Sequence, residues 1–499
     1  MENPLILKIM PQLEEIRKNR IKKLEMMQRA GISVYPLHTK RTHLIMDALK
    51  SFSTIQRSKK EIILTGRIRS LRGHGGATFI DIEDGTGKIQ LFFKKDHLGP
   101  KKYQQFLKYF DIGDFVEVRG ILFKTKKKEK TLLVSGFNIL AKSILPLPEK
   151  WHGLKDVEER FRKRYLDLIF SKEVKEKFIL RNKIIQELRN FLINQGFLEV
   201  ETPVLQSIYG GAKAKPFKTH LNALDMNLFL RIAPELYLKE LLVGGFEKVF
   251  EIGRIFRNEG MDRFHNPEFT SLEFYWAYAD YKELMKLCEK MFAYILKQVF
   301  GTLKIKYQDK TIDFKTPWKR VDFYQLIKKE TKINLEEIHP DALKKKAEAM
   351  GIKIEKGQGL AEIADEIYKK IIRPKIWEPT FIIHHPYGAF PLAKSLPKDN
   401  QKLANFQLVA GNWELVNAFS ELNNPLKQRE IFKEQEKMYK QGYEEAQKTD
   451  EGFLEALEYG MPPAAGFGMG IDRLVALLTN SHSLREIILF PTMRPKKND

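Results

Sequence analysis

The chain has 499 residues, of which 43% are hydrophobic and 11% aromatic, so it can bury a sizeable core and is not disordered. At this length two or three domains are expected rather than one. Its 86 Lys and Arg exceed its 64 Asp and Glu, which gives a net charge of +22. This excess favours a polyanionic partner such as RNA, DNA, the ribosome or an anionic membrane. A lysine-rich genome that decorates every surface is the alternative explanation.

The single cysteine, Cys288, excludes an internal disulfide and a cysteine-rich zinc site, and it fits a reducing cytosol. It lies in a helical-looking run and is expected to be a small buried apolar residue. The N-terminus lacks the apolar core and cleavage site of a signal peptide. No stretch reaches the roughly 18 apolar residues of a membrane span. We therefore expect a soluble, cytoplasmic protein.

The N-terminal part of the chain predicts a helical extension, residues 1–55, followed by a small β domain, residues 56–146. Residues 11–30 have the apolar spacing of an amphipathic helix, whose basic face is either solvated or in contact with RNA. Several short β-rich runs separated by Gly, Asp and Lys turns fill residues 61–145, which favours an OB-fold barrel. The lysine run 124–130 is predicted to be the solvated tip of a hairpin.

A proline-marked and then arginine-rich segment, residues 147–172, predicts a linker to a domain over residues 173–499. That domain opens with a helix that stops before Gly196, a residue suited to a helix C-terminus. Strands are predicted at FLEVETPVL, LFLRIA and KVFEIGRIFR. Residues 336–375 are helical in pattern and rich in Lys and Glu without a chemical signature, and therefore indicate an insertion.

Common nucleotide-binding motifs are absent from the sequence. There is no GxxxxGK[ST] loop and no strand-linked GxGxxG, so neither a P-loop NTPase nor a Rossmann dinucleotide site is indicated. The glycine-rich GFGMG, residues 466–470, instead opens a helix that contains an arginine.

Three separated blocks carry the chemical signal. The first is GFLEVETPVL, residues 196–205. The second, residues 250–281, places Arg257 on a strand before a turn, with further polar and aromatic residues beyond it, so that it offers a guanidinium for a phosphate and an aromatic face for a base. The third, residues 466–478, offers Arg473 at a helix start, where backbone N–H groups favour anions. A lone arginine is usually an ordinary surface ion-pair residue, but three such blocks in this order are more specific.

The three blocks resemble motifs 1, 2 and 3 of the class II aminoacyl-tRNA synthetases, and the chain resembles the bacterial-type lysyl-tRNA synthetases from about residue 61 to the C-terminal ILFPTMRP. The matching segments include DIGDFVEVRG, YGGAKAKPF, LRIAPELYLKELLVGGFEKVFEIGRIFRNEG and VNAFSELNNP. The resemblance implies an α+β fold, in which an antiparallel sheet flanked by helices follows an N-terminal OB-fold. It also implies a homodimer formed through the first motif. The implied activity is ATP-dependent activation of L-lysine and its transfer to the 3′ end of tRNA(Lys).

The resemblance further implies roles for residues at the nucleotide. Arg257 is expected at the α-phosphate and Arg473 at the γ-phosphate, as the two catalytic arginines. Phe269 is expected to stack on adenine and Glu259 to contact its edge. The other residues expected to bind ATP are His265 and Asn266 at the bent triphosphate and Glu414, which would also bind Mg²⁺.

Other positions that match the family imply the lysine-binding site. Its carboxylates would hold the two ammonium groups of lysine, because an unpaired ammonium is costly to bury. The residues expected to bind lysine are Gly211, Glu235, Glu273, Tyr275, Asn417, Phe419 and Glu421. Each carboxylate alone could equally belong to a structural ion pair.

In the β domain the resemblance implies that Phe79 stacks on the central anticodon base and that Gln90 hydrogen-bonds to it, as OB-folds read single strands. The alternative for Phe79 is a place in the barrel core.

The sequence departs from the family pattern at several places. Gln407 stands where a carboxylate metal ligand is usual, Gly388 and Phe390 replace a carboxylate and a serine, and Ser135 stands where an acidic residue is expected near the end of the barrel. A second hypothesis therefore stays open, namely a class II paralogue that lysylates another target or only binds RNA.

Overall fold

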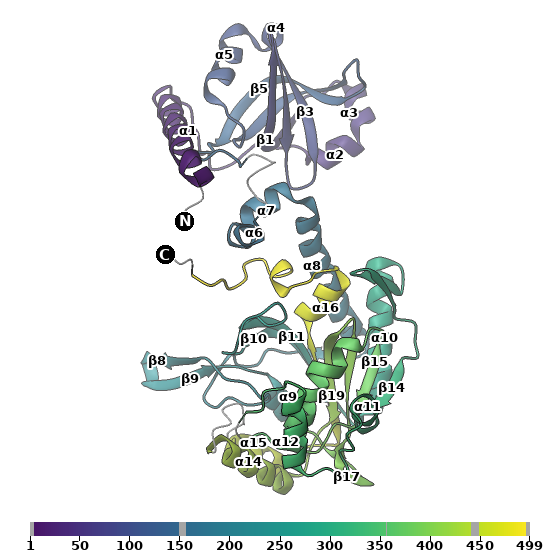
Figure 1. The fold of residues 1–499 in the computed structure, drawn as a ribbon. Coiled ribbons are helices and arrows are strands. Elements are labelled where there is room, and N and C mark those ends of the chain that lie inside the picture. Colours follow the sequence, from purple (N-terminus) through teal and green to yellow (C-terminus); the bar gives the residue numbers. More distant parts are fainter. Residues whose placement is uncertain (1–3, 149–155, 356, 441–448, 496–499) are drawn as a thin grey trace. The chain divides into compact units, whose positions relative to one another are not determined.

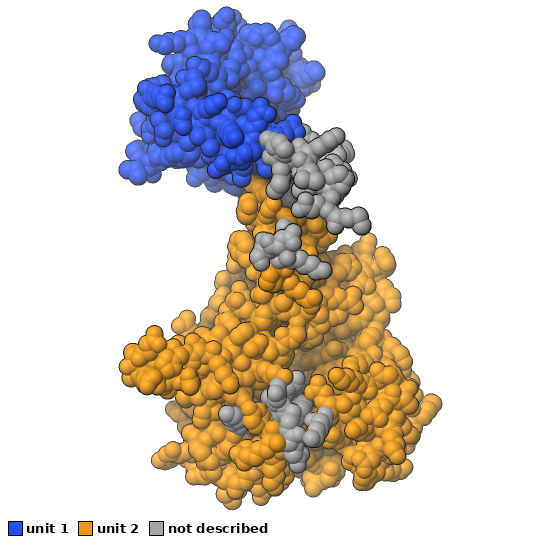
Figure 2. Space-filling view, turned by 60° about the vertical axis from the view of Figure 1, so that its left-hand side comes forward, with its two compact units in different colours: residues 1–155 blue, residues 156–499 orange. Residues whose placement is uncertain are grey.

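The computed structural model describes residues 4–148, 156–355, 357–440 and 449–495, with side chains from residue 12 onward. The chain divides into two compact units, residues 1–155 and 156–499, which are coloured separately in Figure 2. Among the described residues, none of the helices has the length and apolar character needed to cross a membrane. Part of the linker predicted at 147–172 lies outside the described residues.

The first unit is built on a closed five-stranded barrel with the strand order β1-β2-β3-β5-β4, and β4 closes it against β1. All neighbouring strands are antiparallel except β3 and β5. The strands are β1 (Ile62–His74), β2 (Ala77–Glu83), β3 (Lys88–Lys94), β4 (Phe115–Lys124) and β5 (Lys130–Ala141). The predicted barrel is therefore present, and the lysine run 124–130 is the turn between β4 and β5, as predicted.

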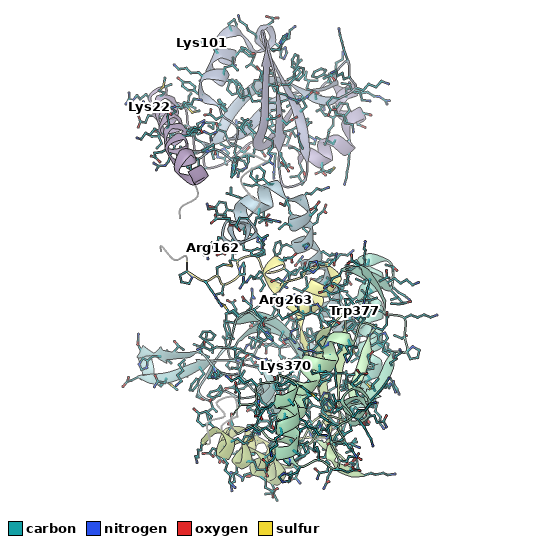
Figure 3. The ribbon with its side chains drawn as sticks, viewed as in Figure 1. Lys22, Lys101, Arg162, Arg263, Lys370 and Trp377 are labelled. Atoms are coloured by element: carbon teal, nitrogen blue, oxygen red, sulfur yellow. The ribbon has the colours of Figure 1, made fainter. Side chains whose placement is uncertain are left out.

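Five helices accompany the barrel: α1 (Pro4–Arg29), α2 (Ile45–Lys50), α3 (Phe52–Ser58), α4 (Lys95–Leu98) and α5 (Pro100–Tyr109). The predicted basic helix is α1, which begins earlier than expected. It is fixed to the barrel unit by Met27, fully buried in its core, and by Arg20, whose guanidinium donates to three carbonyls of the loops around β4 and β5. Other basic side chains, such as Lys22 on α1 and Lys101 on α5, project into solvent (Figure 3).

The second unit is organised around an eight-stranded sheet with the order β14-β15-β18-β19-β20-β11-β10-β6, antiparallel apart from its two edge pairs. Its strands are β6 (Leu198–Glu199), β10 (Lys248–Phe256), β11 (Glu268–Ala277), β14 (Lys319–Asp322), β15 (Thr380–Ile383), β18 (Asn405–Ala410), β19 (Trp413–Ser420) and β20 (Ala464–Gly470). Smaller sheets contain β7 (Leu205–Gln206), β8 (Lys218–Leu221), β9 (Met226–Leu230), β12 (Lys304–Tyr307), β13 (Lys310–Asp313), β16 (Ser395–Leu396) and β17 (Asp399–Leu403).

Helices flank this sheet (Figure 1). The helices in the described part of the second unit are α6 (Val157–Arg162), α7 (Arg164–Phe170), α8 (Lys172–Asn194), α9 (Glu235–Val243), α10 (Tyr281–Phe300), α11 (Phe323–Thr331), α12 (Pro340–Ala349), α13 (Leu360–Ile367), α14 (Pro425–Lys440), α15 (Glu451–Glu458) and α16 (Ile471–Leu478). Short helical turns are η1 (Asn222–Leu224), η2 (Tyr368–Ile372), η3 (Arg373–Lys375) and η4 (Leu484–Glu486). The largest apolar core lies between α8, α10, α16 and the sheet, and it buries Cys288 completely, as expected.

Two local predictions show how tertiary contacts modify sequence patterns. Helix α8 ends as predicted, because Gly196 adopts a φ of 82° and Phe197 N donates to Leu192 O at 3.0 Å. The long strand predicted at FLEVETPVL is wrong, since only the two-residue strands β6 and β7 form there. Between them the backbone N–H of Thr202 donates to the Glu251 carboxylate at 3.2 Å instead of a neighbouring strand.

The predicted insertion is helical in part, as α12 and then a continuous run of α13, η2 and η3. Helix α12 ends at Ala349, and the next helix, α13, begins at Leu360. Within the run, η2 is a π-helical turn, a feature that often occurs at functional sites. The insertion shares an apolar core with the preceding segment 323–335 and with Ile382 and Val409 of the main sheet. It is therefore packed on the sheet rather than detached from it.

Candidate active site

A cavity of about 710 Å³ lies over the central strands of the second unit, and the insertion also lines it. All seven residues expected at ATP line this cavity: Arg257, Glu259, His265, Asn266, Phe269, Glu414 and Arg473. Six of the seven residues expected to bind lysine also line the cavity: Gly211, Glu235, Glu273, Tyr275, Asn417 and Phe419. The seventh, Glu421, is fully buried and bonded to Lys239, which also contacts Glu235. Segments far apart in the sequence therefore meet in one site.

Arg257 follows β10 directly and is held by its own backbone, since its N–H donates to Pro267 O at 2.8 Å across the turn of the second block. Its guanidinium lies 5.2 Å from the centre of the Phe269 ring, and its hydrogen bonds to described residues are long, at 3.4 Å to Ile232 O. Because the hydrogen bonds of this half-buried guanidinium are weak, it is available to bind an anionic ligand.

Arg473 stands in the first turn of α16, immediately after β20. The turn is fixed by its neighbour Asp472, which accepts from Thr270 N at 3.1 Å and pairs with Arg181 at 2.5 Å. The Arg473 guanidinium reaches the Glu414 backbone oxygen at 3.2 Å and His265 Nε2 at 3.2 Å. Among the described residues it forms no ion pair with a carboxylate, so its charge too is available.

The carboxylate end of the cavity contains a buried ammonium that the sequence did not reveal as functional. Lys239 Nζ, fully buried on α9, lies 2.7 Å from Glu235 and also forms an ion pair with Glu421. Burial raises the pKa of both carboxyl groups, and the Lys239 ammonium opposes that rise. Lys239 thus fixes the two side chains in place, one from α9 and one from the segment after β19.

Glu273, on β11, completes the carboxylate cluster. Burial and the neighbouring Glu235 charge raise the pKa of Glu273 to about 8, and Tyr275 OH donates to its carboxylate at 3.3 Å. Glu273 also faces Glu251 directly across the sheet. Like charges in that position are destabilising, and Arg231 offsets them by pairing with Glu251.

Two glycines leave the space that a ligand would need beside these carboxylates. A Cβ at Gly466 would overlap Glu421 Oε1 and the Tyr275 ring. Gly211 has a φ of 84°, and a Cβ there would approach Glu235 Cβ to 2.9 Å. Larger side chains at either position would therefore displace the carboxylates or fill the cavity.

The formal charges identify the kind of ligand that fits. Glu235, Glu273 and Glu421 carry three negative charges when ionised and Lys239 carries one positive charge, so the cluster amounts to −2. A buried cluster of this charge calls for two cationic groups in the ligand. Asn417 Oδ1 adds a buried acceptor without a hydrogen-bond partner among the described residues.

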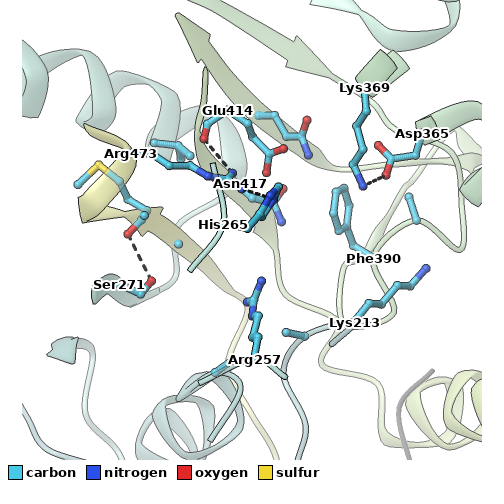
Figure 4. A pocket seen from close by; sticks show the side chains of 18 of the residues that line it. Lys213, Arg257, His265, Ser271, Asp365, Lys369, Phe390, Glu414, Asn417 and Arg473 are labelled. Carbon is cyan, nitrogen blue, oxygen red and sulfur yellow. Dashed lines mark hydrogen bonds and ion pairs between the residues drawn. The ribbon is translucent and has the colours of Figure 1, made fainter. Parts of the chain in front are cut away.

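The insertion contributes a wall of charged side chains to the cavity, and several of these charges form ion pairs. Arg373 pairs with Glu414 at 2.8 Å, Lys369 with Asp365 at 2.6 Å, and Lys213 reaches across to Glu362 at 2.7 Å. Figure 4 shows Arg257, Arg473 and Lys369 directed toward the same space from different sides. The insertion therefore takes part in the site, although its sequence pattern had no chemical signature.

Of the departures at 388, 390 and 407, Phe390 and Gln407 line this cavity, and Gly388 directly precedes the lining residue Ala389. Gly388 adopts a φ of 90°, and its carbonyl accepts from Lys213 at 3.0 Å. Phe390 lines the cavity and stacks on Phe419, with their ring centres 6.1 Å apart. Gln407 is buried on β18, with Oε1 unbonded among the described residues. In the part of the chain that the structure describes, no group of three His, Cys, Asp or Glu residues is arranged to hold a metal.

In the first unit, Phe79 and Gln90 lie on the outer face of the barrel. Phe79 is partly exposed and absent from the barrel core, so the core alternative is wrong. It stacks on Phe92 at 4.6 Å, and Phe123 lies 6.1 Å beyond Phe92. Gln90 is paired across β2 and β3 with Asp81, on the same face, and its Oε1 accepts from Thr131.

Ser135 lies on the same barrel, on β5, and its hydroxyl donates to the carboxylate of Glu61, which also lies 3.4 Å from Arg119. A carboxylate is thus present beside Ser135, supplied from the residue before β1. The aromatic row and this carboxylate together offer stacking and polar contacts to an extended single strand.

Comparisons with known proteins agree with both units. The family described as tRNA synthetases class II (D, K and N) matches residues 156–494, and the OB-fold nucleic acid binding domain matches residues 62–140. The chain is 48% identical over 486 residues to the lysine–tRNA ligase of Carboxydothermus hydrogenoformans, covering 97% of this chain and 99% of that one. The chain belongs to the class II lysyl-tRNA synthetase family. It is an α+β protein with the class II antiparallel sheet and an N-terminal OB-fold, as predicted.

Two further relatives have a similar sequence identity. The chain is 47% identical to the lysine–tRNA ligase of Pelotomaculum thermopropionicum, with 97% of this chain and 96% of the relative covered. It is 49% identical to that of Aquifex aeolicus over 88% of this chain and 74% of the relative. Both units of this lysyl-tRNA synthetase family member are therefore covered by its relatives.

Reasoning from the sequence missed Lys239, Arg373 and the aromatic partner Phe92. Lys239 follows Glu235 by four residues on one helix, a spacing that indicates an i,i+4 ion pair. Phe92 alternates with Gln90 on β3, which places both on one face. No sequence signal distinguishes Arg373 from the other basic residues of the insertion.

Proposed function

We propose that the protein activates L-lysine with ATP to form lysyl-adenylate and transfers the lysyl group to the 3′ end of tRNA(Lys). The observation that carries this proposal is the buried cluster of Glu235, Glu273, Glu421 and Lys239, which has two negative charges for the two ammonium groups of one lysine once all three carboxyl groups are ionised. The lysine carboxylate would then lie toward Arg257, which is electrostatically coupled to Glu273 across the cavity.

In the first step the lysine carboxylate attacks the α-phosphate in line and pyrophosphate leaves, so no protein nucleophile is needed. Arg257 would stabilise the charge that develops on the α-phosphate and Arg473 would hold the γ-phosphate. Phe269 would stack on adenine and Glu259 would contact its edge, with His265 and Asn266 beside the triphosphate. Catalysis then consists of positioning and charge neutralisation.

We further propose that Glu414 would hold a Mg²⁺ ion that enters with ATP, and that this ion would supply positive charge at the phosphates. Glu414 Oε2 accepts from Arg373, and Oε1 accepts no hydrogen bond among the described residues. Burial raises the pKa of Glu414, but Arg373, Arg473 and Lys369 outweigh it and keep the carboxylate ionised. With Gln407 neutral, the donor set fits one such ion and not a second.

Exchange of radioactive pyrophosphate into ATP, measured with each amino acid in turn, tests the activation step. Exchange with lysine and charging of tRNA(Lys) are expected. Exchange with a different amino acid only would contradict the substrate. No exchange at all would favour an RNA-binding paralogue, and exchange without charging would favour a different lysylation target.

For the first unit we propose recognition of the tRNA(Lys) anticodon by Phe79 and Gln90, supported by the exposed aromatic row on the barrel and by the surplus of basic residues. Phe79→Ala should weaken tRNA charging about 10-fold or more, since stacking of one base is worth about 1–3 kcal/mol. Pyrophosphate exchange without tRNA should not change. Phe93→Ala, which removes a buried barrel phenylalanine, is the matched control for mere destabilisation.

Equal losses of charging and exchange in Phe79→Ala, or a melting temperature lowered as much as in Phe93→Ala, would contradict the anticodon role.

Lysine binding is expected to release protons. Without lysine the Glu273 carboxyl, whose pKa is about 8, is mostly protonated at pH 7. An incoming ammonium favours the ionised form, so the proton leaves. Calorimetric titration of lysine in buffers of different ionisation enthalpy should show release of up to about one proton at pH 7, declining above pH 8. Apparent lysine affinity should rise from pH 6 to 8. Proton uptake, or affinity independent of pH, would contradict ionisation of Glu273 by the ligand.

We also propose a homodimer formed through the segment around residues 196–205. Apolar side chains that a monomer would leave in water support it, since Leu198 and Leu205 are each 49% exposed and Val204 is 38% exposed. The finer division into an extension (1–55), a barrel (56–146), a linker (147–172) and a catalytic domain (173–499) remains a proposal. So does action in the cytoplasm, where an enzyme that charges tRNA for translation is expected.

A further inference from the structure

The insertion places three charged side chains on one face of a continuous helical run. Asp365, Lys369 and Arg373 are spaced by four residues, a spacing that aligns them through the α-helical and π-helical turns. All three line the cavity. Lys369 pairs with Asp365 at 2.6 Å, so its charge is already offset within the insertion.

Arg373 differs because its partner belongs to the nucleotide site itself. Its Nη1 donates to Glu414 Oε2 at 2.8 Å, and both side chains are about four-fifths buried. Arg473 donates to the backbone oxygen of the same residue at 3.2 Å. Two guanidinium groups therefore converge on Glu414, and Arg373 lies on the same side of the cavity as the arginine assigned to the γ-phosphate.

The surrounding donor set does not favour a second metal ion at this place. Glu414 is the carboxylate of the β18–β19 hairpin that faces the cavity, and one of its oxygens already accepts from Arg373. Gln407 on the same hairpin offers a neutral oxygen, buried and unbonded among the described residues. A hard divalent cation gains less from such a pair than from two carboxylates.

We propose that the guanidinium of Arg373 is a fixed cation at the β- and γ-phosphates of ATP and takes the place of a second divalent ion in this site. A guanidinium supplies planar, paired N–H donors that match phosphate oxygens. Glu414 holds it in position before the nucleotide arrives. This inference rests on the proposed function and adds a residue from the insertion to the ATP-binding machinery.

The number of metal ions bound with the nucleotide tests the proposal. The wild-type protein, with lysine and a non-hydrolysable ATP analogue, is titrated with Mn²⁺ and the bound ion is counted by electron paramagnetic resonance. One tightly bound Mn²⁺ per protomer is expected. The double variant Arg373→Gln, Gln407→Glu, which removes the guanidinium and restores a carboxylate, should bind two. Two or more ions in the wild type, or one in the double variant, would overturn the proposal.

Nucleotide affinity at fixed Mg²⁺ provides the second readout. Arg373→Gln should weaken binding of the analogue by about 10-fold or more, as expected for loss of a charged hydrogen bond. Arg373→Lys, which keeps the charge but loses the paired N–H donors, should weaken binding less than Arg373→Gln does. Lys375→Gln is the matched control, since Lys375 lies two residues on and pairs with Glu330 away from the cavity. Unchanged affinity in Arg373→Gln would contradict the role.

These results are separable from the proposed function. Pyrophosphate exchange by the wild type with lysine would stand whether one or two ions bind, so a count of two removes only the role of Arg373.

Discussion

Arg257→Ala should lower the rate of lysine-dependent pyrophosphate exchange by at least about 10³-fold, because removal of one preorganised group that stabilises transition-state charge typically costs about 10²–10³ in rate and this arginine carries a full charge. The half-buried guanidinium has only 3.4 Å hydrogen bonds to lose, so the fold should be little affected. Exchange kinetics and a thermal melt measure the two effects. Binding of tRNA(Lys) should be unchanged.

Arg254→Ala is the matched control for Arg257→Ala. Arg254 lies on the same strand, β10, but is exposed and pairs with Glu268 at 3.4 Å outside the cavity. Its loss should leave exchange within about 2-fold, as is usual for an exposed ion pair. Exchange retained in Arg257→Ala, or lost equally in both variants, would show that the charge at the α-phosphate comes from elsewhere.

Glu273→Gln should raise the lysine concentration needed for half-maximal exchange by about 100-fold or more, since leaving a buried charge without its partner costs about 3–5 kcal/mol. The substitution is nearly isosteric. Because burial raises the pKa of Glu273 to about 8, the side chain is mostly neutral at pH 7 without lysine, and glutamine resembles that state. Stability should therefore change little, while the ligand loses one of its counter-charges.

The control for Glu273→Gln is Glu268→Gln on the same strand, β11, where the side chain is exposed. Calorimetry should show proton release on lysine binding in the control and its loss in Glu273→Gln. A lysine affinity that falls by less than about 3-fold in Glu273→Gln would mean that Glu273 is a structural carboxylate and not a ligand.

Much of the fold and of the site follows from local patterns. Alternating apolar residues and turn signals predicted the barrel, and the helix that stops at Gly196 ends there because glycine accepts the positive φ. The carboxylates and arginines of the site were found through the resemblance, since each block preserves a recognisable spacing. The resemblance did not identify the residues that hold each of these side chains in place.

The remainder depends on contacts between distant segments, which no local pattern encodes. The segment after Gly196 is not a continuous strand, because Glu251, about 50 residues away, binds the backbone of Thr202. The place of Arg373 in the cavity could not be predicted, because it depends on the ion pair with Glu414, which belongs to a different segment. From its neighbours in sequence, Lys239 is expected to be an ordinary helix lysine. Its burial depends on the ion pair with Glu421, which another segment contributes.

The most direct test of the lysine site is a crystal structure of the protein with lysine and a non-hydrolysable ATP analogue. Both ammonium groups of lysine should lie at about 3 Å from carboxylate oxygens of Glu235, Glu273 or Glu421, with the lysine carboxylate facing the α-phosphate beside Arg257. Lysine bound outside this cluster, or a nucleotide whose phosphates avoid Arg257 and Arg473, would contradict the account.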